Sequence, residues 1–249
     1  MRNISAWLKH RRARHGNAFP SLHWKPFLWV TASLVLLALL ALDTPLGAAR
    51  MSPAARWFGR GFTDYGKSDW ILYACLFVII QSGVAFRALR RRRERMHALF
   101  ISHVAFYAFA CIALSGISAN LLKRLIGRAR PVHFDDWGVF GFSPLSFDAK
   151  FESFPSGHST TLGALFMILA LLLPRHRLLW GVIAVWLAAT RVMVGAHYPS
   201  DVIAGFAYGT WFSLATAIVF SRYGLVFRLS AEGWPILRQK LTFSRRINA

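Results

Sequence analysis

The sequence predicts an all-α membrane protein whose chain crosses the bilayer six times. Hydrophobic residues make up 55% of the 249 positions and charged residues only 16%, whereas soluble domains carry about 25% charged residues. The charged residues also gather in blocks between apolar stretches. Each apolar stretch is near the length needed to cross about 30 Å of hydrocarbon. We therefore expect one membrane-embedded domain over residues 1–249, with tails at 1–26 and 223–249.

Six apolar stretches supply the expected transmembrane helices. Two of them are short for a perpendicular span, so their ends are less sharply defined by the pattern. In chain order they are Phe27–Leu42, Trp70–Leu89, Ala98–Leu122, Gly157–Leu173, Leu178–Ala196 and Val202–Phe220.

The connection between the first two stretches, Asp43–Asp69, is itself partly apolar. Trp57 and Phe58 lie between two arginines, Arg56 and Arg60. This mixture favours a short helix lying flat in the outer membrane interface, although an irregular loop fits the pattern equally well.

The distribution of Lys and Arg predicts the orientation. Twenty of the 30 basic residues fall in the segments on the same side as the two termini. Because cytoplasmic loops carry the excess of Lys and Arg, we expect both termini in the cytoplasm of a bacterium and the protein in its inner membrane, as a multi-pass protein. The net charge of +20 comes without any groove-reading motif, so nucleic-acid binding is not expected.

Several basic residues contradict that preference, because they fall in or beside the outward connections: Lys123, Arg124, Arg128, Arg130, Lys150 and Arg191. We interpret Arg124 and Arg128 as surface residues that snorkel to lipid headgroups. Lys123 and Arg130 are seven residues apart, about two helical turns, so on one helix they would point the same way. Both side chains suit phosphate oxygens, and Pro131 would end that helix.

A second cluster, Pro155-Ser156-Gly157-His158, opens the fourth stretch. Ser156 suits the N-cap of a helix. The free backbone N–H groups and the dipole of a helix start form a ready site for an anion. Alone, the motif would equally fit an ordinary capping turn.

A third cluster joins the fifth and sixth stretches and contains Arg191, His197 and Asp201. Pro199 favours a helix start near residues 198–200, which places Asp201 in the first turn. From there its carboxylate is expected to accept a hydrogen bond from one nitrogen of His197 and leave the other nitrogen free as a nucleophile.

The three clusters together resemble the type 2 phosphatidic acid phosphatase superfamily, whose signature is K-x6-RP, PSGH and SR-x5-H-x3-D. The one departure is Thr190 in place of the first serine of the third block, and threonine keeps a hydroxyl. The resemblance implies six spans and a metal-independent lipid phosphatase with no cofactor and an active site facing the periplasm.

The resemblance also implies the role of each site residue. His197 is the nucleophile that forms a phosphohistidine, His158 is the general acid and base, and Asp201 orients His197. The phosphate would be held by Lys123, Arg130, Ser156, Gly157 and Arg191. No metal ligands are expected, and the adjacent Asp135 and Asp136 are interpreted as solvated loop residues.

The substrate is expected to be a membrane lipid. Segment 62–68 and two segments of the loop after Arg130, 135–138 and 140–144, resemble members that act on lipid A phosphates, which we therefore favour. Phosphatidylglycerol phosphate, phosphatidic acid and undecaprenyl diphosphate remain alternatives. A non-hydrolytic transporter of anionic lipids is an alternative of another class, although the inverted repeats or paired broken helices typical of transporters are not found. The sequence gives no indication of oligomeric state.

Overall fold

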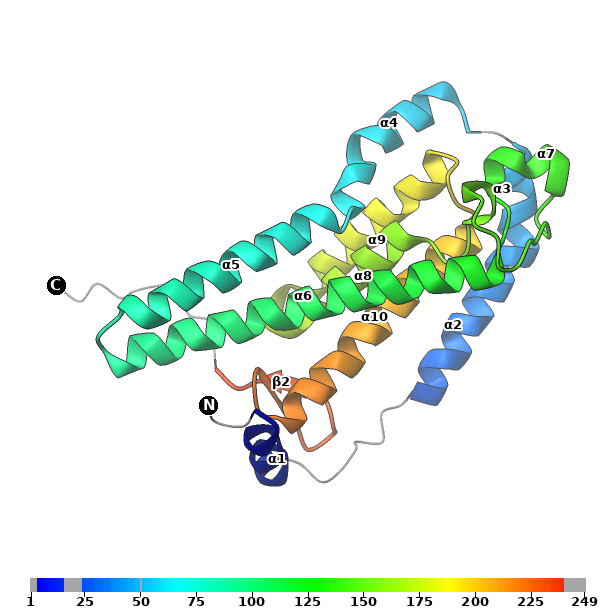
Figure 1. Ribbon diagram of the computed structural model, residues 1–249. Coiled ribbons are helices and arrows are strands. Elements are labelled where there is room, and N and C mark those ends of the chain that lie inside the picture. The colour runs from blue at the N-terminus through cyan, green and yellow to red at the C-terminus, as the bar shows by residue number, and fades with distance from the viewer. Residues whose placement is uncertain (1–3, 16–23, 50, 240–249) are drawn as a thin grey trace.

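A computed structural model describes residues 4–15, 24–49 and 51–239 of the chain. Its helices run side by side in an elongated bundle, with α4 lying across one end and α1 across the other (Figure 1). Within the described residues, four helical segments are long and apolar enough to cross a membrane. These are 24–48, 53–88, 92–126 and 199–222.

Each apolar stretch of the sequence coincides with helix. The helices are α1 (Ile4–His15), α2 (Trp24–Ala38), α3 (Thr44–Ala48), α4 (Pro53–Thr63), α5 (Asp69–Ala88), α6 (Arg92–Ile126), α7 (Phe134–Trp137), α8 (Gly157–Leu172), α9 (Arg177–Met193) and α10 (Pro199–Arg222). A π-helical turn, Leu39–Asp43, joins α2 to α3.

Helix α6 is longer than the stretch Ala98–Leu122 that predicts it. It has 35 residues, which corresponds to about 52 Å and exceeds the thickness of the hydrocarbon core. The additional first turns are rich in arginine and are exposed, so they extend the helix beyond its apolar part. A tight turn at 89–91 connects this end to α5.

The partly apolar segment after the first span contains the helix expected there, α4. Ser52 caps it by accepting a hydrogen bond from the backbone N–H of Ala55 at 3.2 Å. Gly59 lies against α9, where an added Cβ would come within 3.2 Å of the Thr190 carbonyl oxygen. Trp57, in contrast, is 78% exposed. Helix α4 thus packs on the bundle through one face and presents the other outward.

The C-terminal region adds a structural element that the all-α prediction lacks. Strands β1 (Phe227–Leu229) and β2 (Pro235–Leu237) form an antiparallel pair. The Phe227 ring is fully buried and lies edge-on to Tyr107 of α6 at 4.9 Å between centroids. The expected C-terminal tail therefore contains a short hairpin with its own contacts to the bundle.

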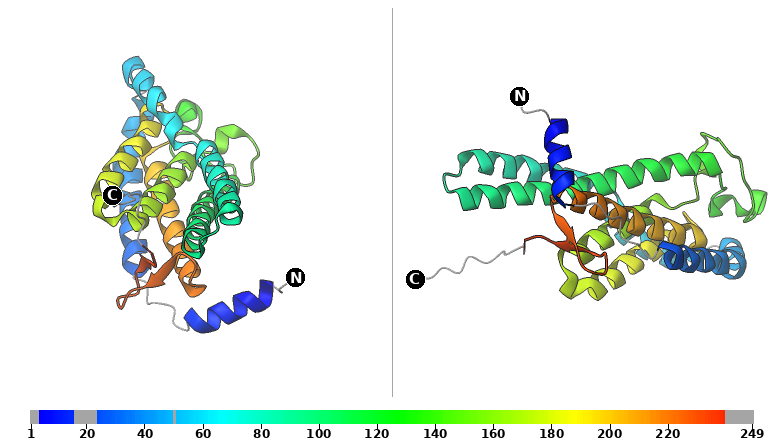
Figure 2. Two further views of the ribbon diagram at one scale, coloured as in Figure 1. Left: turned by 90° about the vertical axis from the view of Figure 1, so that its left-hand side faces the viewer. Right: turned by 90° about the horizontal axis from the view of Figure 1, so that it is seen from below.

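Helix α1 lies beside the C-terminal end of helix α10 (Figure 2). Arg11 of α1 donates hydrogen bonds to the carbonyl oxygens of Tyr223 and Gly224, both at 2.7 Å. The remainder of the expected tails, 1–3, 16–23 and 240–249, lies outside the described residues.

Helices α8 and α10 approach unusually closely, and glycines make this possible. A Cβ built on Gly209 would lie 1.9 Å from the carbonyl oxygen of Thr160, and one on Gly205 would lie 2.4 Å from that of Ser156. Small residues at this spacing allow membrane helices to pack backbone to backbone. The close approach brings the first turns of both helices together, where Ser156 N–H donates to the Asp201 carbonyl oxygen at 3.0 Å.

We predict that Gly209→Ala destabilises the protein by roughly 1–3 kcal/mol, because the methyl group would collide with backbone rather than with a movable side chain. Thermal unfolding in detergent measures the effect. Gly116→Ala is the matched control, since nothing lies within 4 Å of the added Cβ in α6, and there alanine should be neutral or stabilising. Equal stability of the two variants would contradict the prediction.

Candidate active site

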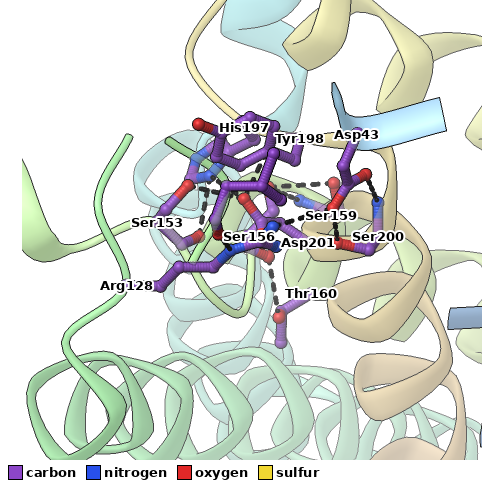
Figure 3. A network of polar contacts seen from close by, with 11 residues as sticks. Asp43, Arg128, Ser153, Ser156, Ser159, Thr160, His197, Tyr198, Ser200 and Asp201 are labelled. Atoms are coloured by element: carbon purple, nitrogen blue, oxygen red, sulfur yellow. Dashed lines mark hydrogen bonds and ion pairs between the residues drawn. The ribbon is translucent and has the colours of Figure 1, made fainter. Parts of the chain in front are cut away.

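The three sequence clusters meet at one end of the bundle. Helix α6 and helix α9 end there, and helix α8 and helix α10 begin there. The polar side chains at this end form a dense buried network (Figure 3). The predicted start of the last helix is confirmed, because α10 begins at Pro199.

His197 lies at the centre of this end, in the turn before α10, and is only 2% exposed. Its Nδ1 is 2.8 Å from the carbonyl oxygen of Ser153. Because a carbonyl oxygen can only accept, Nδ1 carries the proton, and the unprotonated nitrogen of the neutral ring is Nε2. The contact with Ser153 therefore favours the tautomer whose unprotonated nitrogen is Nε2.

The partner of His197 differs from the one predicted. The nearest carboxylate oxygen of Asp201 is 3.9 Å from Nδ1, which is an electrostatic contact rather than a hydrogen bond. The direct bond is made instead by the carbonyl group of Ser153, which precedes the Pro155-Ser156-Gly157-His158 cluster by two residues. Asp201 influences the ring through its charge and through Ser153, whose hydroxyl donates to the carboxylate at 2.5 Å.

The carboxylate of Asp201 is fully buried and has three donors in all. Besides Ser153, it accepts hydrogen bonds from the backbone N–H of Tyr198 at 3.0 Å and from Arg128 at 2.5 Å. The bond to Tyr198 caps the start of α10. The carboxylate thereby holds the His197 turn, the Ser153 loop and helix α10 in one arrangement.

The interpretation of Arg128 as a surface residue that snorkels to lipid headgroups was wrong. Its side chain is buried and bridges two carboxylates, with Nη1 on Asp201 and Nη2 on Asp43 at 2.8 Å. The guanidinium group also lies 4.4 Å from the centre of the Tyr198 ring. Asp43 directly follows the first apolar stretch, and a buried carboxylate at such a place requires a charged partner. This aspartate was therefore the signal in the sequence that one of the outward arginines is buried. Arg124 differs, since it stays half-exposed near Glu152.

The start of helix α8 has the predicted cap. Ser156 is the N-cap and accepts a hydrogen bond from the backbone N–H of Ser159. A Cβ added at Gly157 would lie 3.3 Å from the Lys123 ammonium nitrogen, so this cation lies directly beside the helix start. His158 follows, next to Gly66, where an added Cβ would lie 3.3 Å from its ring.

Lys123 and Arg130 do not share a helix, contrary to the prediction. Helix α6 ends at Ile126, and Gly127 adopts a left-handed conformation with φ +64°. A side chain there would be strained and would also strike the carbonyl group of Ser143, 1.9 Å from an added Cβ. Arg130 therefore follows in extended backbone, and the loop rather than the helical repeat brings it to the site.

Arg191 approaches from the last turn of α9. Its Nη1 donates to the hydroxyl of Thr63 at 2.6 Å, which ties α9 to the end of α4. Within the part of the chain that the structure describes, the Nε atoms of both Arg191 and Arg130 are buried without a hydrogen-bond partner. Buried donors without a partner are costly, and a bound anion would satisfy them.

We call Lys123, Arg130, Arg191, Ser156 and Gly157 the anion cradle. The charges of Lys123 and Arg191 both act on His197, and the charges of Arg130 and Arg191 both act on Lys123. The three cations therefore lie near one another, and Lys123 and Arg191 lie near the imidazole of His197. In the described residues, no group of three or more His, Cys, Asp or Glu could hold a metal ion.

Burial lowers the pKa of His197 to about 4, and the nearby cations Lys123 and Arg191 act in the same direction. Since the folded protein binds this proton less tightly than the unfolded chain, His197 costs stability as the pH falls from about 6.5 towards 4. We predict that lowering the pH from 7.5 to 5 destabilises the wild type by roughly 2 kcal/mol more than His197→Gln. Thermal unfolding at both pH values measures this, and equal losses would contradict it.

Comparison with known proteins agrees with this architecture. The PAP2 superfamily profile matches residues 104–224. The lipid A 1-phosphatase of Rhizobium johnstonii is 48% identical over 96% of this chain and 98% of its own length. Phosphatidylglycerophosphatase B of Bacillus subtilis is 27% identical over 74% of this chain and 85% of its own length.

A solved structure shares the fold. The crystal structure of a transmembrane PAP2-type phosphatidylglycerolphosphate phosphatase from Bacillus subtilis superposes with a TM-score of 0.52 at 24% identity, covering 78% of this chain and 91% of that one. Fold and site thus define a helical membrane protein with a buried histidine near cationic side chains. The chain belongs to the PAP2 superfamily.

Proposed function

We propose that this protein is a lipid phosphatase that removes a phosphate group from lipid A through a phosphohistidine intermediate. The observation that carries the proposal is the buried His197, whose Nδ1 lies on the Ser153 carbonyl oxygen and whose ring lies near the charges of Lys123 and Arg191. A free imidazole nitrogen among three cations suits attack on a phosphate group.

In the first step, Nε2 of His197 attacks phosphorus in line with the leaving oxygen. The P–N bond forms, the P–O bond to the lipid breaks, and His158 donates a proton to the departing oxygen. The ring acquires positive charge, which the carboxylate of Asp201, 3.9 Å from Nδ1, stabilises. The cradle holds the phosphoryl oxygens through both stages.

In the second step, His158 accepts a proton from water, and the resulting hydroxide attacks phosphorus. The P–N bond breaks, inorganic phosphate leaves and neutral His197 is restored. The cycle requires no metal ion, because the cradle and the start of helix α8 supply the positive charge that the phosphoryl group needs.

We further propose that the chain makes six spans in a bacterial inner membrane, with the cradle facing the periplasm and both termini in the cytoplasm. The arginine-rich segment at 90–93, where the turn enters α6, and helix α1 lie at the end of the bundle opposite the cradle, which supports this orientation. Helices α8 and α9, with 16 and 17 residues, then cross a locally thin region or are completed by their flanking turns.

Lipid A is the substrate that the relatives favour. Lipid A 1-phosphatases are 48% identical over 96% and 88% of the chain. Relatives named for other lipid phosphates, such as undecaprenyl diphosphate, match 60–74% of it at lower identity. Similarity over nearly the whole length includes the loops around the cradle, where a headgroup would be selected.

Phosphate release by purified protein tests the proposal. In the presence of excess EDTA, we expect release from lipid A to be fastest, ahead of phosphatidylglycerol phosphate, phosphatidic acid and undecaprenyl diphosphate. A different order would overturn the substrate assignment alone. Activity that disappears with EDTA and returns with a divalent ion would overturn the mechanism. Binding or transport of these lipids without phosphate release would overturn the proposed function.

A further inference from the structure

A buried charge cluster lies beside His197, with a carboxylate oxygen 3.9 Å from Nδ1 of the imidazole ring. It consists of Asp43, Arg128 and Asp201, drawn from three distant parts of the chain (Figure 3). Asp43 and Asp201 are 0% exposed and Arg128 is 2% exposed. Burying three ionised groups is expensive, and helix packing alone would not require it.

The cluster is fully hydrogen-bonded and tightly specified. Arg128 contacts one oxygen of each carboxylate, at 2.5 Å for Asp201 and 2.8 Å for Asp43. Asp43 also accepts the backbone N–H of Ser200 at 3.0 Å and the hydroxyl of the same residue. Asp43 thus ties the end of the first span to the first turn of α10, directly after His197.

With one guanidinium and two carboxylates ionised, the cluster carries a formal net charge of −1. The proposed reaction places a positive charge on the imidazole ring of His197, 3.9 Å from this cluster. At that stage the ring and the cluster together become neutral. In a buried region of low effective dielectric, such compensation is strong.

We propose that Asp43 and Arg128 are positioning residues that set the charge beside His197 and hold Asp201 in place. Arg128 fixes the carboxylate of Asp201 and limits its negative charge, while Asp43 fixes Arg128 and restores the excess of one negative charge. The inference rests on the proposed role of His197 as the nucleophile. Neither residue belongs to the anion cradle.

The charge count makes an ordered prediction for three variants. Arg128→Gln leaves a cluster charge of −2, Asp43→Asn leaves 0, and the double variant restores −1. More negative charge stabilises the protonated imidazole of His197 and less destabilises it. We call the fall of kcat at low pH, where His197 becomes protonated, the acid limb. It should therefore move to higher pH by roughly one unit in Arg128→Gln and to lower pH in Asp43→Asn. In the double variant it should return close to its position in the wild type.

Other charged groups face His197 as well, and all of them stay unchanged in these variants. Lys123 approaches from α6, Arg191 from α9 and His158 from α8, and Asp201 belongs to α10. The substrate phosphate titrates near pH 6 and contributes equally to every variant. Differences between variants in the pH of the acid limb consequently reflect the charge of the cluster.

The experiment measures kcat against pH for each variant in detergent, with lipid A as substrate and folding checked by thermal unfolding. Arg124→Gln is the matched control, because this arginine lies four residues away on the surface and is 52% exposed; its acid limb should equal that of the wild type. We expect at least about a tenfold fall in kcat for each single variant, together with opposite shifts of the limb.

The inference would be overturned if the acid limb did not move, or if it moved in the same direction in both single variants. A purely structural role would lower activity without shifting the acid limb in opposite directions. If Arg128→Gln does not fold, the comparison of Asp43→Asn with the wild type decides the matter alone, because a limb that is unshifted or raised contradicts it. Absence of phosphate release by the wild type would instead overturn the proposed function.

Discussion

His197→Ala should abolish phosphate release, with kcat reduced on the order of 10⁴-fold or more, because the variant lacks the imidazole that we propose as the nucleophile. The variant should still insert and fold. Only the imidazole ring and its bond to the Ser153 carbonyl group are lost, while Asp201 keeps Arg128, Tyr198 and Ser153 as donors.

Phosphate release from lipid A and thermal unfolding of the same preparation measure the two parts of this prediction. His176→Ala is the matched control, because this exposed histidine lies at the other end of the bundle, between α8 and α9. Added imidazole should partly restore turnover in His197→Ala by occupying the vacated space. Near wild-type turnover in the variant would remove the nucleophile assignment.

Arg191→Ala should lower kcat by roughly 10²- to 10³-fold, because a fixed donor to the phosphoryl oxygens disappears. Arg191→Lys should recover part of the loss, since lysine keeps the charge but not the planar fork. Thr63→Val removes the 2.6 Å bond that holds the guanidinium group, so we expect a smaller loss, about tenfold.

Arg60→Ala is the control for these arginine variants, because Arg60 is an exposed residue of α4. Steady-state kinetics with lipid A separate kcat from KM for each protein. If Arg191→Ala raised KM alone and left kcat unchanged, the guanidinium group would bind substrate and transition state equally. That result would contradict its role in stabilising the transferred phosphoryl group.

Local signals in the sequence predicted several elements correctly. The Ser156 cap and the start of α10 at Pro199 follow from residues that act within one helical turn. The spacing of Lys123 and Arg130 was misleading, because a seven-residue interval suits a helix only if the helix continues. Gly127 ends it, and a glycine at that position was a readable termination signal.

The charge cluster could not be predicted in the same way. Asp43 and Arg128 are 85 residues apart. The pattern of the sequence does not indicate which of the several arginines in the outward connections is buried. The bond from His197 to the Ser153 carbonyl oxygen was equally hidden, because a backbone acceptor leaves no mark on residue identity. Both depend on tertiary contacts that form when the loop over 127–156 folds back on α10.

The most direct test of this account is to identify the phosphorylated residue during turnover. Lipid A labelled with radioactive phosphate is mixed with the enzyme, the reaction is stopped in alkali within one turnover, and the labelled peptide is sequenced by mass spectrometry. We predict phosphate that is stable to base and labile to acid, bound to His197. Label on another residue, or turnover without any covalent label, would contradict the central claim.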